Sequence, residues 1–428
     1  MQVINLPASW YEATAQRGGI EQLRGVQTVD VCVVGGGLAG LTATLELART
    51  GKSVVLLEAS RVACGASGRN GGFVSNGFAL GIGDVAGHVG LEAAQKLHGL
   101  SREGTEYVRS TILQYDASII AGLGTRVAVR YNDDGGLHAY ADELRQRFGE
   151  EIATAGVDET RTLLNSKRYF DSIAFQRAFH IHPLRYALLL KRLCEEAGAK
   201  VFENSAAQKV EKISSIFVVK TSSGEVRAEH VVHCVSALDW KLHAPTARAI
   251  LPVSTYVAVT EPLQQDAIRT PEAIGDTRRA GDYYRLIAGG RILWGGRITT
   301  KVREPQRLAE EMRGDMVSTF PQLGLPRIDY AWAGLMGYAL HKMPLIGRDE
   351  EGQWFATAFG GHGLNTTAMG GLLIARAIAN GDDDYRRFTP FAPRWAFGQL
   401  GRLGVQGSYW WMQARDRFDE ATKTAIRR

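Results

Sequence analysis

The feature that most constrains this chain is the stretch 31–58, where a short apolar run passes without a spacer into a glycine-rich turn. Residues 31–34 (VCVV) are typical of a buried parallel strand, and residues 41–48 carry apolar side chains at helical spacing. Gly51 ends the helix, and a second apolar run follows at 54–57. The pattern predicts a strand, a tight turn, a helix and a second strand.

The glycines of this turn have the spacing of a dinucleotide-binding site. Gly35 permits the tight bend, Gly37 lets the backbone approach a pyrophosphate, and Gly40 lets helix and strand pack closely. The free N–H groups at the start of the helix then bind the anion. Glu58, at the end of the second strand, is placed to accept hydrogen bonds from a ribose, and an acidic residue there disfavours a phosphorylated ribose. Glycine turns also occur by chance, but this one has the strand and helix context that the site requires.

A second glycine-rich segment, residues 61–73 (RVACGASGRNGGF), follows where a nicotinamide-binding domain normally begins another helix. On its own this segment would also fit a flexible surface loop. Together with the preceding turn, it resembles the flavoprotein family of D-amino acid oxidase, glycine oxidase and sarcosine oxidase. In that family the loop wraps the FAD pyrophosphate and reaches the flavin ring, so the resemblance implies FAD as the cofactor.

Length and composition restrict the class of protein. A chain of 428 residues is too long for one ordinary core, so two interleaved domains are expected. The hydrophobic fraction of 45% and charged fraction of 22% are typical of a soluble globular protein. The net charge of +5 is small, and no basic block interleaved with aromatics is present, which argues against nucleic acid as a partner. The four cysteines show no CxxC spacing, and no plausible set of metal ligands is visible.

Targeting signals are not evident. No basic region followed by a continuous apolar segment stands at Met1, so we expect no cleavable export signal and a cytoplasmic location. The most apolar window, 31–48, is interrupted by glycines and a glutamate, so no transmembrane segment is expected. Before the first domain, Trp10 and Tyr11 stand on an N-terminal arm. We expect them to dock on the domain surface, with cover of an active-site entrance as the alternative.

The order of patterns along the chain predicts an interrupted cofactor domain. Periodicity predicts helices at 91–120, 142–149, 184–198 and 305–320, a hairpin at 126–141, a strand at 200–203, a three-stranded meander over 207–237, and alternating strands at 252–260, 283–288 and 291–298. The expected fold is α/β, a Rossmann-like FAD-binding domain with an interleaved α+β substrate domain built on an antiparallel sheet. The predicted divisions are an N-terminal arm (1–25), an FAD-binding domain (26–105, 180–240 and 326–385), a substrate domain (106–179 and 241–325) and a C-terminal extension (386–428).

The closing cofactor segment is a strand, a glycine turn and a helix over residues 354–380. A glycine turn at a helix N-terminus supplies backbone donors and a positive dipole. The family resemblance implies that this end points at the flavin C2 carbonyl and N1. His362 in this turn either donates to the flavin or is a bystander.

Six short segments narrow the resemblance to the gamma-glutamylputrescine oxidase branch: HIHPL at 180–184, DYYRL at 282–286, FPQL at 320–323, IDYAW at 328–332, GHG at 361–363 and RDRF at 415–418. Members with covalent FAD tend to place a histidine near the position of Arg69 or a cysteine in the C-terminal segment. This chain has neither, so we expect noncovalent FAD. The family's usual glycine is missing at 234–236, which puts close backbone approach there in doubt.

The resemblance assigns FAD contacts to Gly35, Gly37, Leu38, Ala39, Gly40, Glu58, Ala59, Arg61, Gly65, Ala66, Ser67, Arg69, Asn70, Gly71, Gly72, Val210, Gly360, Gly361, His362, Gly363 and Leu364. The candidate catalytic residues are Arg69, Tyr284, Arg297, His341 and Lys342. Of these, His341 and Lys342 stand in a segment where the family's usual Thr and Asp are replaced by Ala339 and His341. Arg69, Arg297 and Lys342 are candidates for the cation that assists oxygen reduction, and Tyr283, Tyr284 and Trp332 for an aromatic pocket wall.

The implied reaction is oxidation of an amine C–N bond, with a hydride passing to flavin N5 and an imine that hydrolyses to an aldehyde or oxo acid. Oxygen would be reduced to hydrogen peroxide, and gamma-glutamylputrescine or a related amine is the expected substrate. The alternative is a dehydrogenase that passes electrons to a quinone or an electron-transfer protein, which the aromatic C-terminal residues Tyr409, Trp410 and Trp411 would support. A flavin-binding protein without this activity would call for a basic face or a catalytic cysteine pair, and neither is visible. The sequence does not indicate an oligomeric state.

Overall fold

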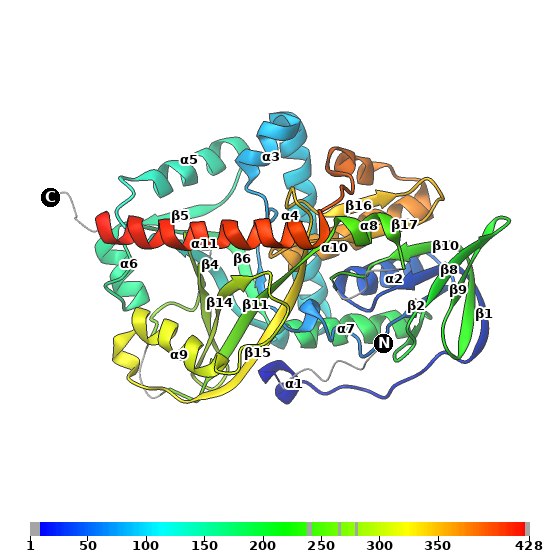
Figure 1. Ribbon diagram of the computed structural model, residues 1–428, viewed down its shortest axis with the longest axis horizontal. Coiled ribbons are helices and arrows are strands. Elements are labelled where there is room, and N and C mark those ends of the chain that lie inside the picture. Colours follow the sequence, from blue (N-terminus) through cyan, green and yellow to red (C-terminus); the bar gives the residue numbers. More distant parts are fainter. Residues whose placement is uncertain (1–8, 238–241, 264–266, 279–280, 424–428) are drawn as a thin grey trace.

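The computed structural model describes residues 9–237, 242–263, 267–278 and 281–423, and its two sheets lie side by side in one elongated body (Figure 1). Sheet A runs in the order β16 (Leu345–Arg348), β17 (Trp354–Thr357), β10 (Gly224–His233), β1 (Gly25–Val34), β2 (Val54–Leu57) and β7 (Lys200–Phe202). β1 pairs in parallel with both β10 and β2, while β8 (Lys209–Ile213) and β9 (Ile216–Lys220) extend β10 as the expected meander. The Rossmann-like half of the prediction is therefore confirmed.

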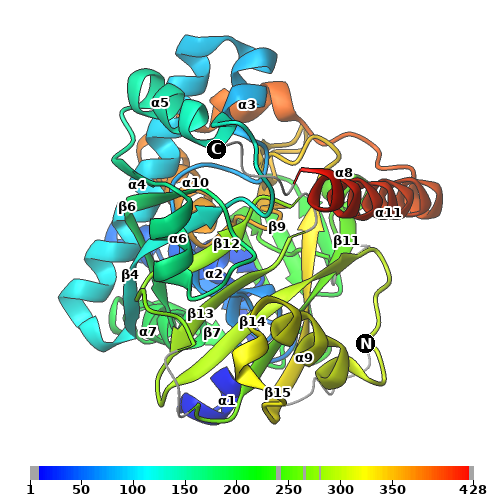
Figure 2. The ribbon, with the colours of Figure 1, turned by 90° about the vertical axis from the view of Figure 1, so that its left-hand side faces the viewer.

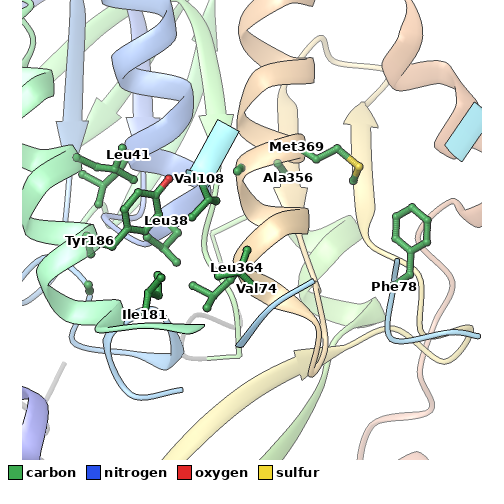
Figure 3. Packing of buried hydrophobic residues seen from close by; sticks show 14 of the residues in the cluster. Leu38, Leu41, Val74, Phe78, Val108, Ile181, Tyr186, Ala356, Leu364 and Met369 are labelled. Atoms are coloured by element: carbon green, nitrogen blue, oxygen red, sulfur yellow. The ribbon is translucent and has the colours of Figure 1, made fainter. Parts of the chain in front are cut away.

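Four helices pack beside this sheet: α2 (Leu38–Arg49), α4 (Leu91–Tyr115), α7 (Pro183–Glu196) and α10 (Gly363–Asn380). Figure 3 shows Leu38 and Leu41 of α2 with Tyr186 of α7 in one apolar cluster, and Leu364 and Met369 of α10 belong to the same cluster. α10 and α2 lie close together at Gly371, where an added Cβ would stand only 2.8 Å from the Ala39 carbonyl oxygen. This approach is possible because glycine has no side chain. α2 follows β1 and α10 follows β17, and both strands run parallel to β10, so the two helix N-termini lie at the same end of sheet A.

Sheet B is the predicted antiparallel sheet. Its order is β15 (Ile328–Tyr338), β11 (Leu251–Thr260), β14 (Arg291–Thr299), β13 (Tyr283–Ile287), β12 (Ala273–Asp276), β4 (Ile120–Ala128), β6 (Ser172–Ile181) and β3 (Phe73–Val74), with β5 (Ile152–Ala155) beside β6. Every pair is antiparallel except β12 with β4. α9 (Leu308–Thr319) covers one face, and the other face turns toward the cofactor half of the molecule.

The remaining helices are α1 (Trp10–Thr14), α3 (Ile82–Val89), α5 (Gly136–Phe148), α6 (Val157–Leu164), α8 (Ala244–Ala249) and α11 (Gly398–Thr422), with short 3-10 turns at Ala66–Gly68, Ala117–Ile119, Pro321–Leu323 and Asp384–Phe391. Trp10 and Tyr11 are buried on the body of the protein, so docking of the arm is confirmed. Within the described residues, no helix is both long and apolar enough to cross a bilayer. The expectation about an export signal concerns residues 1–8, which lie outside the described part.

Two of the predicted domain boundaries do not follow the arrangement of strands and helices in the structure. The boundary at 326 placed β15 in the cofactor domain, but β15 pairs with β11 from Leu251 to Thr260 and so belongs to sheet B. The boundary at 105 divides α4, which continues unbroken to Tyr115 and packs against α10. In each case the pattern showed a strand or helix but not its partner, because the partner lies far away in the sequence.

The predicted hairpin at 126–141 is also wrong. β4 pairs with β6 and β12, and after the turn the chain enters α5 instead of returning as a strand. The Asp133 carboxylate accepts the Leu137 N–H at 2.7 Å, which satisfies a free donor in the first turn of the helix. The same Asp and Gly residues that suggested a hairpin turn are the start signal of a helix here.

Candidate active site

The glycine turn between β1 and α2 forms a cradle with no room for side chains. Gly35 has a φ of +110° and donates its N–H to the Leu57 carbonyl at 2.8 Å. A Cβ on Gly35 would lie 2.7 Å from the Cys234 carbonyl oxygen, and a Cβ on Gly40 only 2.0 Å from that of Gly35. Close backbone approach at Cys234 therefore does occur, and Gly35 provides the space for it.

Glu58 closes one side of the cradle. Its carboxylate accepts the N–H groups of Gly36 and Ser60, both at 2.8 Å. Burial raises the pKa of Glu58, although these backbone hydrogen bonds act in the opposite direction. Val210 belongs to β8 and packs against the apolar cluster that contains Leu57. Its contact with the cofactor stays a prediction.

The loop 61–73 lies between the two sheets and is fixed to both. On the side of sheet A, Ser67 Oγ accepts the Leu38 N–H at 3.1 Å. On the side of sheet B, Trp332 Nε1 donates to the Arg69 carbonyl at 3.0 Å, and Arg285 Nε donates to the Gly71 carbonyl at 2.7 Å. Within the loop, the Asn70 side chain donates to the Ala66 and Ser67 carbonyls. The predicted loop residues are brought together, and hydrogen bonds on both sides tie the loop to the body of the protein.

The glycine turn before α10 meets the last residues of β15. The Gly360 N–H donates to the Gly337 carbonyl at 3.0 Å, and the Gly361 N–H binds the Tyr338 hydroxyl. Burial raises the pKa of Tyr338 to about 12. The N-terminus of α10, which begins at Gly363, therefore points toward the region between the sheets, with its positive dipole end there.

His362 holds a neighbouring loop. Its Nε2 lies 3.1 Å from the Ser75 carbonyl and 3.0 Å from the Asn76 carbonyl, and two acceptors require this nitrogen to carry the proton. Burial lowers the pKa of His362, which keeps the ring neutral. Asn76 in turn donates to the Glu150 carboxylate at 2.8 Å, and His98 lies 2.6 Å from the same carboxylate. His362 Nε2 is thus engaged with the protein backbone.

The aromatic residues of sheet B lie on two opposite faces, because side chains alternate along each strand. Tyr283 points to the cofactor side, where it contacts Phe73 edge-on at 5.6 Å and a side chain on Gly71 would clash with it. The phenol of Tyr283 has a raised pKa because it is buried, with a smaller contribution from Tyr338. Trp332 faces the same side, where its ring contacts Tyr11 at 5.5 Å. Tyr283, Trp332 and Tyr338 thus form an aromatic inner face.

Two predicted catalytic residues lie elsewhere, because each has its side chain directed to α9. Tyr284 is fully buried, donates to the Tyr169 hydroxyl at 2.7 Å and stacks on Trp294 at 4.6 Å in the core beneath α9. Arg297 is ion-paired with Asp315 and Glu311 of α9. Adjacent strand residues face opposite ways, so Tyr283 and not Tyr284 reaches the inner face.

The other three predicted catalytic residues do not lie together: Arg69 is beside sheet B, and His341 and Lys342 are in the turn after β15. Arg69 is buried beside sheet B, donates through Nε to the Ala333 carbonyl at 2.9 Å and has a pKa lowered by burial. The Ala333 N–H binds the Glu304 carboxylate, so opposite charges flank this residue of β15. His341 lies instead in the turn after β15, where its ring contacts Phe391 at 5.5 Å. Lys342 follows it in an exposed position with a φ of +61°.

Arg285 was predicted only as a candidate to line the pocket, and in the structure it anchors the loop 61–73. This residue is 1% exposed, and besides Gly71 it donates to the Ile181 carbonyl at 2.7 Å and the Tyr11 hydroxyl at 3.2 Å. Its Nη1 lies 2.9 Å from His180 Nδ1, while His180 Nε2 donates to the Pro271 carbonyl. A basic residue inside a strand of otherwise apolar and aromatic residues was the one available signal.

A comparison with protein-family models matches residues 30–377 to the DAO family of FAD-dependent oxidoreductases. The chain belongs to this family. It is 33% identical to gamma-glutamylputrescine oxidoreductase of Escherichia coli over 393 residues, which cover 90% of this chain and 91% of that protein. FAD is therefore the cofactor of this enzyme.

Solved structures share the fold at lower identity. Glycine oxidase from Geobacillus kaustophilus superimposes with a TM-score of 0.74 at 17% identity and covers 86% of this chain and 99% of its own. L-proline dehydrogenase from P. horikoshii superimposes with a TM-score of 0.72 at 19% identity, covering 88% and 99%. The fold class predicted from the sequence is thus confirmed by proteins of known structure.

The residues present fit FAD. The cradle at Gly35 and Gly40 has backbone where any side chain would clash, Glu58 offers acceptors at the adenosine end, and the α10 N-terminus offers donors at the other. Among the described residues, no group of three His, Cys, Asp or Glu side chains could hold a metal ion. The donors and acceptors of the site are those a dinucleotide requires.

Proposed function

We propose that this enzyme oxidises the C–N bond of an amine, with gamma-glutamylputrescine or a related amine as substrate and oxygen as electron acceptor. The observation that carries the proposal is the aromatic inner face of Tyr283, Trp332 and Tyr338, which lies directly across from the loop 61–73 and the α10 N-terminus. The 33% identity to gamma-glutamylputrescine oxidoreductase supports the choice of substrate.

The balanced reaction is R–CH2–NH2 + H2O + O2 giving R–CHO + NH3 + H2O2. FAD, when bound, supplies the two-electron oxidation of the C–N bond. The pyrophosphate would be held by Gly35, Gly37, Gly40 and the first N–H groups of α2, and the ribose by Glu58. No covalent link is proposed, because Arg69 stands where relatives with covalent FAD tend to have histidine, and no cysteine follows Cys234.

The chain's own residues bind and orient the amine. The phenols of Tyr283 and Tyr338 are protonated at neutral pH, since the pKa of tyrosine is ordinarily about 10 and burial raises the pKa of both, so they offer neutral hydrogen-bonding groups. An apolar aromatic wall disfavours an ammonium ion by desolvation, which favours the neutral amine that the oxidation requires. Arg69 provides positive charge beside this wall, suited to a carboxylate on the substrate such as that of the glutamyl group.

Dehydrogenation with a quinone or an electron-transfer protein as acceptor is the second candidate. It is favoured by one observation, the exposed aromatic residues Trp410 and Trp411 on α11. The fold does not decide between the two, since it is shared with both a glycine oxidase and a proline dehydrogenase. A cytoplasmic location is proposed for either activity.

Oxygen consumption distinguishes the oxidase from the dehydrogenase. The purified enzyme would be given gamma-glutamylputrescine, putrescine, glycine and proline in air, with oxygen uptake, peroxide and aldehyde measured together. We expect gamma-glutamylputrescine to give one peroxide per aldehyde. Aldehyde formed only when an artificial quinone is added would identify a dehydrogenase, and turnover of none of the amines would contradict the substrate proposal. Release of yellow cofactor by acid precipitation would support noncovalent FAD, and yellow colour left in the pellet would refute it.

A further inference from the structure

The C-terminal helix α11 packs on the protein with its polar side inward. Only three of its residues are fully buried, and all three are polar: Gln406, Asp416 and Asp419. Gln406 Oε1 accepts the Thr299 hydroxyl at 2.7 Å and the Thr300 N–H at 2.9 Å. A helix on a globular protein normally turns its apolar side to the core. The orientation of α11 is the reverse.

The outward side of α11 is an apolar stripe. Leu400 is 74% exposed, Trp410 and Trp411 are each 60% exposed, and Phe418 is 62% exposed. With Leu403 and the small exposed residues Gly404, Gly407 and Ala414, these positions recur every three or four residues and so fall on one side of the helix. Trp395 and Phe397 continue the exposed apolar surface just before the helix begins. Large side chains in such a stripe mark a surface that contacts another apolar phase.

The basic residues near the stripe are exposed, and the acidic residues of the same turns face the body of the protein. Arg415 and Arg417 are exposed and stand on opposite sides of the stripe, and Arg415 Nε also lies 3.6 Å from the carboxylate of the buried Asp419. The acidic groups of the same turns point to the body instead: Asp416 and Asp419 are buried, and the Glu420 carboxylate lies 3.7 Å from Arg130. The outer surface of α11 is therefore both aromatic and positively charged.

We propose that the α11 stripe docks on the surface of an anionic phospholipid membrane. Tryptophan, phenylalanine and leucine on one side of a helix with basic residues at its margins are the pattern of a helix that lies in the membrane interface. Membrane phosphates neutralise the arginines, whereas the α11 surface of a second copy, described over residues 398–422, holds no exposed acidic residue that could pair with them. Among the described residues no helix can span a bilayer, so the contact is peripheral.

The docked surface adjoins the candidate active site. α11 contacts β11 and β14 of sheet B, and β11 pairs with β15, the strand that carries Trp332 and Tyr338. Figure 1 shows α11 crossing the front of the molecule over these strands, and Figure 2 shows it at the edge of the body. Docking through α11 would hold the site close to the lipid surface. The proposal does not depend on which amine is oxidised.

Vesicle sedimentation tests the proposal with the full-length FAD-loaded enzyme. Vesicles of phosphatidylglycerol and phosphatidylethanolamine should sediment the protein, and vesicles of phosphatidylcholine alone should sediment much less. Raising the salt concentration should weaken the binding, since screening acts on exposed charges. The double variant Trp410→Ser, Trp411→Ser should bind anionic vesicles about tenfold less, and Arg415→Gln, Arg417→Gln should lose the preference for anionic lipid.

The matched control is Leu123→Ser, Leu325→Ser, which removes two exposed leucines outside α11 and should bind vesicles like the unaltered protein. Retained FAD and an unchanged melting temperature show that each variant is folded. The proposal is overturned if the unaltered enzyme does not sediment with anionic vesicles, or if the tryptophan variant binds them equally well. It is also overturned if sedimentation velocity shows a dimer that the tryptophan variant dissociates, because the stripe would then bind a second copy.

Discussion

Sheet A and sheet B both reach the loop 61–73, but they contribute different kinds of groups to it. Sheet A contributes backbone: the turn at Gly35 and Gly40 works because side chains are absent. Sheet B contributes side chains: Trp332 and Arg285 hold the loop, and Tyr283 faces it. The backbone half is suited to a constant ligand, the cofactor, and the side-chain half to a ligand that differs between relatives.

Substitutions in the two sheets should have different effects, because sheet A holds the cofactor and sheet B faces the amine. Changes in the sheet A turn should remove the cofactor and all activity with it. Changes on the inner face of sheet B should leave FAD in place and alter the reaction with the amine.

The largest effect is expected when one methyl group is added to the glycine turn between β1 and α2. In Gly40→Ala the new Cβ would lie 2.0 Å from the Gly35 carbonyl oxygen, so strand and helix must separate and the cradle opens. We expect the purified protein to carry almost no FAD by its visible absorbance. Gly99→Ala is the matched control, because Gly99 is also helical and has no atom within 4 Å of the new Cβ. A fully yellow Gly40→Ala protein would contradict the account of the turn.

The anchor Arg285 is the next largest test. Arg285→Met leaves the buried carbonyls of Gly71 and Ile181 without this donor, and each such loss costs about 1 to 3 kcal/mol. We expect the free energy of unfolding in urea to fall by about 3 kcal/mol at fixed FAD concentration, with FAD bound more weakly. The surface variant Arg307→Met is the control. An unchanged stability would show that Arg285 does not hold the loop.

The neighbours Tyr283 and Tyr284 sharpen the comparison within sheet B. Tyr283→Phe should retain FAD but lower kcat/KM for the amine about tenfold, because a polar group is lost from the inner face. Tyr284→Phe leaves the Tyr169 hydroxyl without its donor and should lower stability by about 1 kcal/mol with kcat/KM unchanged. Steady-state kinetics and urea unfolding of both variants check this. Reversed effects would mean that the inner face has been assigned to the wrong side of the sheet.

The smallest expected effect is on pH dependence. Burial, with a contribution from Arg285, lowers the pKa of His180 to about 3. The unfolded chain binds a proton near its ordinary pKa of about 6.5, so His180 favours folding above that pH and its contribution is lost as pH falls toward 3. We expect a stability slope of up to about 1.4 kcal/mol per pH unit from this group in that window. His180→Gln should flatten the slope measured by urea unfolding, while an unaltered slope would refute the assignment.

The cofactor half was predicted well because its signals are local. Gly35, Gly37, Gly40 and Glu58 lie within one strand–helix–strand unit, and their spacing in that context indicates a dinucleotide. The aromatic arm was also correctly interpreted, since two adjacent large apolar side chains on a tail gain free energy by burial.

The substrate half was predicted less well because its signals are nonlocal. The pattern at 282–286 gives two adjacent tyrosines, and only the position of α9 shows that Tyr284 faces away from the loop. The partner of β15 lies about 80 residues earlier in the chain, so pairing could not be read from the strand itself. At 133–135 the same residues suit a hairpin turn and a helix start, and tertiary packing decides between them.

Anaerobic mixing of the purified yellow enzyme with gamma-glutamylputrescine tests the central claim most directly, because it observes the cofactor accepting electrons from the amine before any acceptor is present. We expect the visible absorbance of FAD to bleach and to return, with peroxide, when air is admitted. Bleaching that air does not reverse would assign the dehydrogenase activity. An enzyme that carries FAD but is bleached by no amine would contradict the proposed function.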